Sequence, residues 1–250
     1  HFVVRGVDKN NLDLTDPIST NKLSSLIDSY SPDVLIILSA IKRHLGDSGS
    51  ILKINNMITD NIIHALSSGS FKIIYLSSCS VYGEKNAQHY YNEISPLNPT
   101  SLYGEHKVYS EQLYQSNISK DRLLILRPPV LFDMLSKDGY HPGSFLNEAI
   151  MRAQISLWGD GRELREFIHI RDFVLIMKIL IHNESIGLVN IVSGKSFSFR
   201  SCAEQIRKNV LCEIIHRQRS NPVVNHTYTN QTLIEKVGPF DFQSPLQALD

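Results

Sequence analysis

The chain has 250 residues, of which 42% are apolar, enough for one large domain or for a domain with a smaller lobe. Lysine plus arginine and aspartate plus glutamate each total 25, so the formal net charge is zero and we expect neither nucleic acid nor an anionic membrane as a partner. Cys79, Cys202 and Cys212 lack disulfide or metal-ligand spacing, which favours a reducing, cytoplasmic compartment and no metal site. No run approaches about 18 apolar residues and no signal-peptide pattern opens the chain, so no membrane span is predicted.

Short apolar runs bounded by polar residues, proline or glycine predict strands buried on both faces, at 1–4, 33–40, 72–83 and 122–132. Helical periodicity marks 19–30, 52–69 and 100–116, the last with Pro99 and Thr100 as start signals. Strands that alternate with helices predict an α/β, doubly wound parallel sheet, which binds ligands at the carboxyl ends of its strands.

The alternation loosens from residue 133 onward. A helix is expected near 143–154, then a short strand at "ISLWG", a glycine turn at "GDGRE" and a helix near 200–210. The pattern predicts a smaller lobe at 133–250, with some of its segments returning to the main sheet.

Polar side chains gather at two places that such a fold brings together. Ser77, Ser78 and Ser80 follow the strand "KIIYL", and Tyr103 and Lys107 lie four positions apart in the next helix, on one face of it. A serine hydroxyl, a phenol and an ammonium group around one strand end could exchange a proton with an alcohol or sugar hydroxyl.

The electrostatics of such a Tyr-Lys pair are favourable for proton transfer. Lowering a tyrosine pKa from about 10 to about 7 requires roughly 4 kcal/mol of preference for the phenolate. A cation about 5 Å away supplies about 3 kcal/mol at an effective dielectric near 20. Lys107 would therefore supply most of the preference, and a positively charged nicotinamide ring would add to it.

The motifs "SSCSVYG" and "PTSLYGEHK" resemble the extended short-chain dehydrogenase/reductase family, in particular its nucleotide-sugar epimerase/dehydratase branch. Further segments resemble the family in the family's order along most of the chain: "LDLTD", "LSAIK", "LRPPVLF" and "WGDGRELREFIHIRDF". The resemblance implies a Rossmann-like fold, with an NAD(P)-binding domain at 1–132 and mainly a substrate-binding lobe at 133–250. It also implies NAD as cofactor, with NADP as the alternative, a nucleotide-diphosphate sugar as substrate, and a homodimer formed through the helices around the Tyr-Lys pair.

The family's functional residues carry over by position. Catalytic roles fall on Ser78, Tyr103 and Lys107. The implied cofactor contacts are Asp8, Asp13, Leu14, Ser39, Ala40, Lys42, Asn55, Tyr103 and Lys107, and the implied substrate contacts are Ser78, Ser80 and Arg165. Asp8 could instead cap a turn, Lys42 could be a plain surface lysine, Asn55 could cap a helix, and Arg165 could pair with Glu166 or Asp172. We expect His141 and His169 to be structural, and Cys79 to be a buried small residue rather than a nucleophile.

Three departures from the family pattern qualify the transfer. The glycine-rich loop that would cradle the cofactor pyrophosphate is missing, and residues 1–4 resemble a second strand. We therefore expect a fragment or truncated product, with weak cofactor binding and an exposed sheet edge. Val130 replaces a substrate-binding asparagine. Cys79 and Ser80 replace the Asp-Glu pair of the dehydratases, which sets dehydration aside.

The first functional hypothesis is therefore an NAD-dependent epimerase that acts at C4 of a nucleotide-diphosphate sugar through a 4-keto intermediate. The rival enzyme is a 4-keto-sugar-nucleotide reductase, because "LWGDGRELREFIH" resembles reductases of the GDP-fucose-synthase type. The hypothesis from another class is a non-catalytic protein that binds a dinucleotide or a sugar nucleotide.

Overall fold

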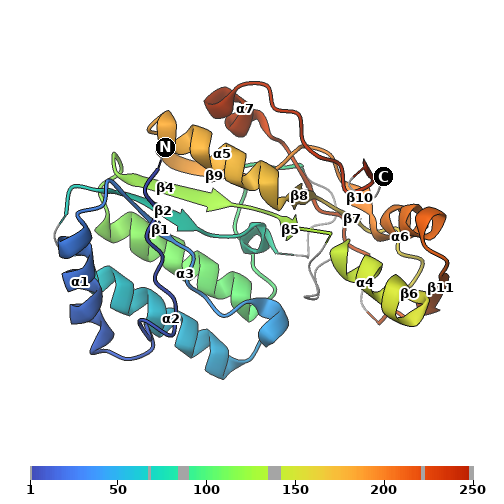
Figure 1. Cartoon of the computed structure of the whole chain (residues 1–250), viewed down its shortest axis with the longest axis horizontal. Helices are drawn as coiled ribbons and strands as arrows, with labels where there is room; N and C mark the ends of the chain where they lie inside the picture. The colour runs from blue at the N-terminus through green and yellow to red at the C-terminus, as the bar shows by residue number, and fades with distance from the viewer. Residues whose placement is uncertain (1, 67–68, 84–89, 135–141, 221–222, 248–250) are drawn as a thin grey trace.

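A computed structural model describes residues 2–66, 69–83, 90–134, 142–220 and 223–247. Four parallel strands form the central sheet in the order β1-β2-β4-β9. They are β1 (Val34–Ile37), β2 (Lys72–Leu76), β4 (Leu123–Arg127) and β9 (Gly187–Asn190). Helices cover both faces of this sheet (Figure 1), so the predicted doubly wound α/β fold is confirmed.

The two faces of the sheet are packed by different helices. On one face lie α1 (Ser19–Tyr30), α2 (Gly49–Ala65) and α3 (Leu102–Asn117); on the other lie α5 (Ile170–His182) and α7 (Gln231–Val237). Successive side chains of a strand point to opposite faces, so one apolar run serves both cores. In β2, Ile73 and Tyr75 pack toward the α1, α2 and α3 side, whereas Ile74 joins the core beneath α5.

A smaller lobe lies beside one end of the sheet (Figure 1). Its main elements are α4 (Gly143–Arg152), β6 (Gln154–Trp158), α6 (Phe199–Asn209) and β11 (Glu213–Arg217). Phe145, Ile155, Leu157 and Ile206 are buried in a separate core there. β9 and α5 follow residue 132 yet belong to the sheet layer. The boundary at 132 itself stays a prediction.

Short elements connect the sheet layer to the lobe. The strands are β3 (Tyr90–Tyr91), β5 (Val130–Phe132), β7 (Leu164–Arg165), β8 (Phe167–His169), β10 (Phe197–Ser198) and β12 (Thr227–Tyr228); the 3₁₀ helices are η1 (Arg43–Leu45) and η2 (Cys79–Tyr82). β5 pairs with β8 and β12 pairs with β3, both in parallel. Polar residues that follow β2 and β4 are thereby brought close to the C-terminal part of the chain.

The strand predicted at the start of the chain is wrong for the residues described there. Phe2, Val3 and Val4 lie outside any strand and are 53%, 92% and 83% exposed. Apolar composition alone does not make a strand, because a strand also needs backbone hydrogen-bond partners. β1 is an edge strand of the four-stranded sheet, with Ile36 39% exposed, as expected for a sheet with an uncovered edge.

The described helices and cysteines bear on the predictions about membrane spans and disulfides. Within the described ranges, none of the helices is both long and apolar enough to cross a bilayer. Cys79, Cys202 and Cys212 are all buried free thiols.

Candidate active site

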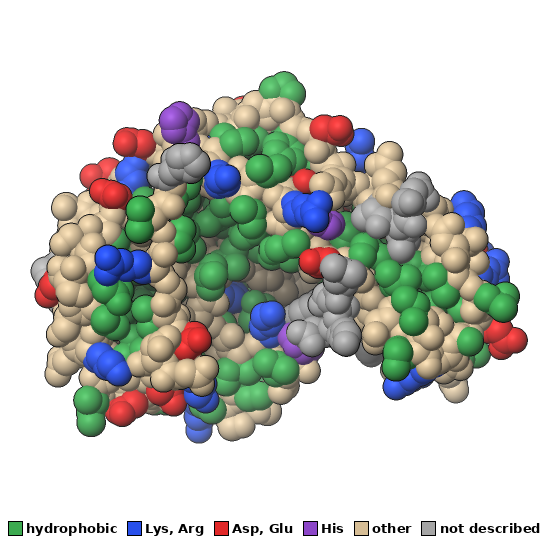
Figure 2. Space-filling view, viewed as in Figure 1, with side chains coloured by type: hydrophobic (Ala, Val, Ile, Leu, Met, Phe, Trp, Pro, Cys, Tyr) green, Lys and Arg blue, Asp and Glu red, His purple; other side chains and the backbone are tan. Residues whose placement is uncertain are grey.

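A cavity of about 490 Å³ opens where β1, β2 and β4 end at their carboxyl side. We call it the strand-end cavity. Its wall includes Ser78, Ser80, Tyr103 and Lys107 from the sheet layer and Arg165 from β7, which follows β6 of the lobe. Figure 2 shows a hollow in the surface between the sheet layer and the smaller lobe. These five predicted site residues therefore share one cavity, together with Ala40 and Lys42.

The serines reach the cavity because β2 ends abruptly. After Leu76 the backbone turns into η2, and Ser78 caps this turn by accepting a hydrogen bond from the backbone N–H of Ser80 at 3.1 Å. The Ser78 hydroxyl donates to Oγ of Ser80, also at 3.1 Å. The two hydroxyls thus form a coupled pair, and the choice between Ser78 and Ser80 as the group that meets a ligand stays open.

Tyr103 lies in the first turn of α3, which packs unusually closely against η2. Ser101 caps the helix by accepting from the Gly104 N–H at 3.1 Å. The N–H of Tyr103 donates to Oδ1 of Asp47 at 2.9 Å. A Cβ at Gly104 would lie 2.7 Å from the carbonyl oxygen of Ser80, closer than such atoms can approach. The glycine between Tyr103 and Lys107 therefore lets the helix approach the serines.

Lys107 is only 2% exposed, and its Nζ makes two hydrogen bonds to β2. It donates to the carbonyl oxygen of Leu76 at 2.8 Å and to the hydroxyl of Tyr75 at 3.2 Å. Nζ lies 5.6 Å from the ring centre of Tyr103, near the separation assumed from the sequence. Burial lowers the pKa of Lys107 to about 7, although the charge of Glu111 opposes this. Burial therefore disfavours the charged form of Lys107, an effect that the spacing of the motif did not reveal.

Some of the predicted cofactor residues after β1 line the cavity, and another supports the segment that forms its wall. Ala40 and Lys42 line the strand-end cavity, whereas Ser39 is not among its lining residues. Asn55 is buried and holds the backbone of Ile41 from both sides, accepting from its N–H at 2.7 Å and donating to its carbonyl at 3.1 Å. Asn55 thus supports the segment that forms the wall.

The predicted cofactor residues before α1 lie outside the cavity lining. Asp8 is exposed and accepts from the N–H of Asn10 at 2.9 Å, as a turn residue does. Asp13 accepts from the N–H and the hydroxyl of Thr15 at 3.0 and 2.7 Å. Leu14 packs against the core under α1 and α2. These contacts are structural, and the cofactor roles of all three residues stay predictions.

The guanidinium of Arg165 is oriented by the backbone of the preceding residue and by the segment before β12. Its Nη1 donates to the carbonyl oxygens of Leu164 and Val224 at 2.9 and 2.5 Å, and its guanidinium lies 5.7 Å from the ring centre of Phe199. A planar guanidinium suits a diphosphate because it can donate two parallel hydrogen bonds. Its diphosphate role stays a prediction.

Sequence reasoning missed Glu166 as a cavity residue, treating it only as a surface partner for Arg165. Glu166 lines the strand-end cavity and is 1% exposed. Its Oε2 accepts from the N–H groups of Ser193 and Gly194 at 2.9 and 3.2 Å, while Oε1 has no hydrogen-bond partner among the described residues. Burial raises its pKa from 4.5 to about 7, against those hydrogen bonds. His226 and Tyr228 complete this wall, and no motif in the sequence marked them.

Other candidate groups have structural roles. His169 caps α5, with Nδ1 accepting from the N–H of Arg171 at 3.2 Å. Cys79 is buried and burial raises its pKa well above the usual thiol range, which does not suit a nucleophile. His141 lies outside the described residues. In the part of the chain that the structure describes, no three His, Cys, Asp or Glu side chains gather in a way that could hold a metal ion.

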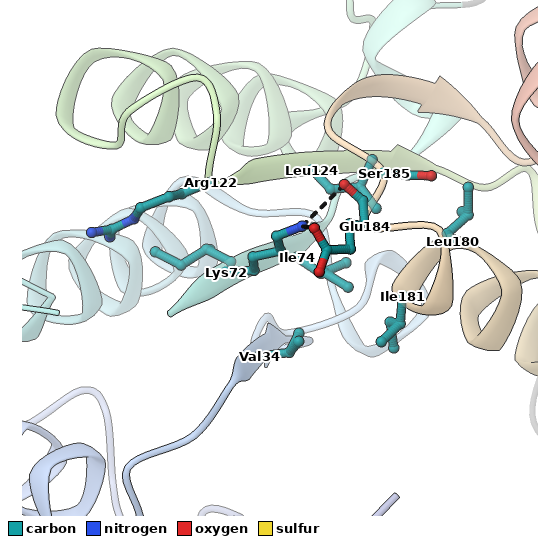
Figure 3. Close-up of a pocket in the computed structure, with 10 residues that line it drawn as sticks. Val34, Lys72, Ile74, Arg122, Leu124, Leu180, Ile181, Glu184 and Ser185 are labelled. Atoms are coloured by element: carbon teal, nitrogen blue, oxygen red, sulfur yellow. Dashed lines mark hydrogen bonds and ion pairs between the residues drawn. The ribbon is translucent and has the colours of Figure 1, made fainter. Parts of the chain in front are cut away.

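A second cavity, of about 10 Å³, lies at the opposite, amino end of the strands (Figure 3). Lys72 borders it and pairs with Glu184, with Nζ 3.3 Å from Oε2 and 3.1 Å from the backbone carbonyl. This volume holds about one water molecule. The strand-end cavity is therefore the better candidate for a ligand site.

Known proteins resemble this chain in sequence and in fold. Residues 3–192 match the model of the NAD dependent epimerase/dehydratase family. UDP-glucuronic acid decarboxylase 1 of Arabidopsis thaliana is 23% identical over 166 residues, covering 63% of this chain and 38% of that protein. dTDP-glucose 4,6-dehydratase of Haemophilus influenzae is 20% identical over 192 residues, covering 69% and 56%. UDP-glucuronic acid 4-epimerase of Bacillus cereus, solved with UDP-glucuronic acid and NAD, superposes with a TM-score of 0.80 at 21% identity, covering 94% of this chain and 77% of that one.

The chain therefore belongs to the NAD dependent epimerase/dehydratase family, whose cofactor is NAD, and its Rossmann-like fold is confirmed. It spans 38% of the length of the plant decarboxylase and 56% of that of the dehydratase. Four of the predicted cofactor contacts, Ala40, Lys42, Tyr103 and Lys107, line the strand-end cavity, and their role toward the cofactor stays a prediction. The 250 residues contain no G-x-x-G-x-x-G loop for the pyrophosphate.

Proposed function

We propose that this protein is an NAD-dependent 4-epimerase of a nucleotide-diphosphate sugar. The observation that carries the proposal is that Ser78, Tyr103 and Lys107 line one cavity at the strand ends of a family whose cofactor is NAD. NAD would supply a hydride acceptor that later returns the hydride to the sugar.

The chain's own groups handle the proton and the oxygen. Tyr103 takes the proton of the C4 hydroxyl and later gives it back, and Lys107, when charged, favours the phenolate. The Ser78 and Ser80 hydroxyls bind the C4 oxygen while it is a carbonyl. Arg165 binds the diphosphate across the cavity from the serines, which leaves the sugar ring between them.

The chemistry at positions 79 and 80 supports epimerisation over dehydration. Removing water from a sugar needs an acid and a base next to the neighbouring carbon. Cys79 is 5% exposed and hydrogen-bonds the backbone carbonyl of Arg127, while Ser80 is a neutral hydroxyl. Neither side chain is a carboxylate, so the strand end supplies no pair suited to elimination.

A 4-keto-sugar-nucleotide reductase is the second candidate, because it would use the same Ser78, Tyr103 and Lys107. The segment "LWGDGRELREFIH" supports it. A non-catalytic protein that binds a sugar nucleotide or a dinucleotide is the third candidate. The reactions differ in cofactor use: an epimerase regenerates its cofactor each turnover, and a reductase consumes NADPH in proportion to product.

The test is to incubate the chain, and the longest product of its gene, with UDP-sugars and NAD in D₂O. UDP-glucuronic acid and UDP-glucose belong in the panel. The proposal predicts a C4 epimer without deuterium at C4, because the hydride returns from the cofactor and not from solvent. A parallel incubation replaces NAD with NADPH and the UDP-sugars with a 4-keto-sugar nucleotide, and a reduced product that forms only as NADPH is consumed would assign the reductase. Binding of sugar nucleotide without any product would assign the non-catalytic alternative.

A further inference from the structure

A buried ion pair lies next to the Tyr103–Lys107 pair, on the side of α3 that packs against the sheet. Glu111 lies one turn after Lys107 on the same helix face and is 2% exposed. Arg127, at the end of β4, is also 2% exposed and contacts it with two donors, Nε to Oε1 at 2.8 Å and Nη2 to Oε2 at 2.5 Å. This is the two-point geometry of a strong carboxylate–guanidinium pair.

The Glu111–Arg127 pair connects α3 with the serine strand end, with the end of β4 and with η2. Ser77, which precedes Ser78, donates its hydroxyl to Oε1 of Glu111. Arg127 donates from Nη1 to the Tyr82 hydroxyl at 2.8 Å, at the end of η2. Glu111 thus binds the serine strand end directly and, through Arg127, the end of β4. A shift of α3 relative to the serines would strain the hydrogen bond between Ser77 and Glu111.

Glu111 also acts on the electrostatics around Lys107, against the larger effect of burial. Several charged and titratable groups surround Nζ of Lys107. Tyr75 lies on β2, Tyr103, His106 and Glu111 lie on the same helix as the lysine, and Arg127 of β4 acts on it through Glu111. Lys42 and Arg43 line the same cavity. Glu111 is the carboxylate that favours the charged lysine, and Arg127 neutralises that carboxylate. Removing Glu111 and removing Arg127 should therefore have opposite effects on Lys107.

We propose that Glu111 and Arg127 are positioning residues that hold Lys107 beside the serine strand end and set its charge state. The catalytic meaning of this proposal rests on the proposed function, but its electrostatic content does not. Buried ion pairs often add little stability, so a role in the site accounts better for this pair than stabilisation does.

The test is an NMR titration of Lys107 in protein labelled with ¹³C at lysine Cε, assigned with Lys107→Met. It needs no turnover, so it separates this proposal from the proposed function. We expect Glu111→Gln to lower the pKa of Lys107 and Arg127→Met to raise it, each by about one pH unit or more. The double variant should return to within about 0.3 pH units of the parent, since the two charges offset each other.

Glu105→Gln removes an exposed carboxylate from the same helix and should leave the Lys107 titration unchanged within about 0.2 pH units, because water and salt screen it. Equal shifts of the same sign in the two single variants, or no shift in either, would overturn the proposal. If a single variant does not unfold cooperatively, Ser77→Ala decides: it frees Glu111 of one hydrogen bond without unpairing a charge. A rise in the Lys107 pKa supports the proposal, and no rise overturns it.

Discussion

At the residue scale, Glu166 combines burial with incomplete pairing in the wall of the strand-end cavity. Burial raises its pKa from 4.5 to about 7, so between these pH values the folded chain binds a proton that the unfolded chain releases. The contribution of this group to the free energy of unfolding is therefore greatest at low pH, and it is lost as the pH rises from 4.5 through 7. A shift of this size corresponds to about 3 kcal/mol.

We therefore predict that Glu166→Gln flattens the decline in stability between pH 4.5 and 8. Urea unfolding of the parent and the variant across this range measures the difference. Glu213→Gln, the same change at an exposed position of β11, is the matched control. Parallel stability curves for the parent and Glu166→Gln would contradict the raised pKa.

Single residues also show what sequence reasoning could and could not reach. Ser78, Tyr103, Lys107 and Arg165 were predictable because each belongs to a motif with fixed spacing. The lowered pKa of Lys107 could not be predicted, because its burial and its hydrogen bonds to Leu76 and Tyr75 depend on how α3 packs on β2. Spacing along the chain contains no information about that depth.

At the element scale, the contact between α3 and η2 sets the distance between Tyr103 and the serines. Gly104 makes this contact possible, since an added Cβ would lie 2.7 Å from the Ser80 carbonyl oxygen and 3.0 Å from Cβ of Pro99. Alanine favours a helix by about 1 kcal/mol over glycine, but here it would push the helix away. Misplacement by about 1 Å can lower a rate by about 100-fold.

We predict that Gly104→Ala lowers kcat by about 10- to 100-fold while the protein remains folded. Gly49→Ala is the control, because Gly49 opens α2 and an added Cβ meets nothing within 4 Å. We expect that variant to keep its turnover and to be as stable as the parent or slightly more so. Parent-like turnover in Gly104→Ala would show that the close approach of α3 does not matter for catalysis.

The elements themselves were predictable to different degrees. The helix predicted at 19–30 is observed as Ser19–Tyr30, and the one at 100–116 as Leu102–Asn117, because helical periodicity and start signals are local. The strand predicted at 1–4 was wrong, since a strand depends on a partner that its own sequence does not encode. Likewise, β12 brings Tyr228 to the cavity wall by pairing with β3, a long-range contact without a local signal.

At the scale of the whole molecule, the strand-end cavity lies between a sheet layer and a smaller lobe. The sheet layer supplies Ser78, Tyr103 and Lys107, and the chain leading into and out of the lobe supplies Arg165 and His226. This division is consistent with chemistry fixed by the sheet and substrate choice determined by the lobe. We expect a homodimer by resemblance to the family, and light scattering would measure it.

The central claim is that Tyr103 transfers the proton in a sugar-nucleotide reaction at the strand-end cavity. The most direct measurement compares turnover and ligand binding in Tyr103→Phe and Tyr109→Phe, in the product of the gene that epimerises a UDP-sugar. Tyr109 lies on the same helix, where its hydroxyl donates to Asp60 of α2 at 2.5 Å. Its variant should therefore keep the parent turnover. Tyr103→Phe should lower kcat by at least about 100-fold while calorimetry shows NAD and sugar-nucleotide binding within about twofold of the parent. Parent-like kcat in Tyr103→Phe would contradict the account.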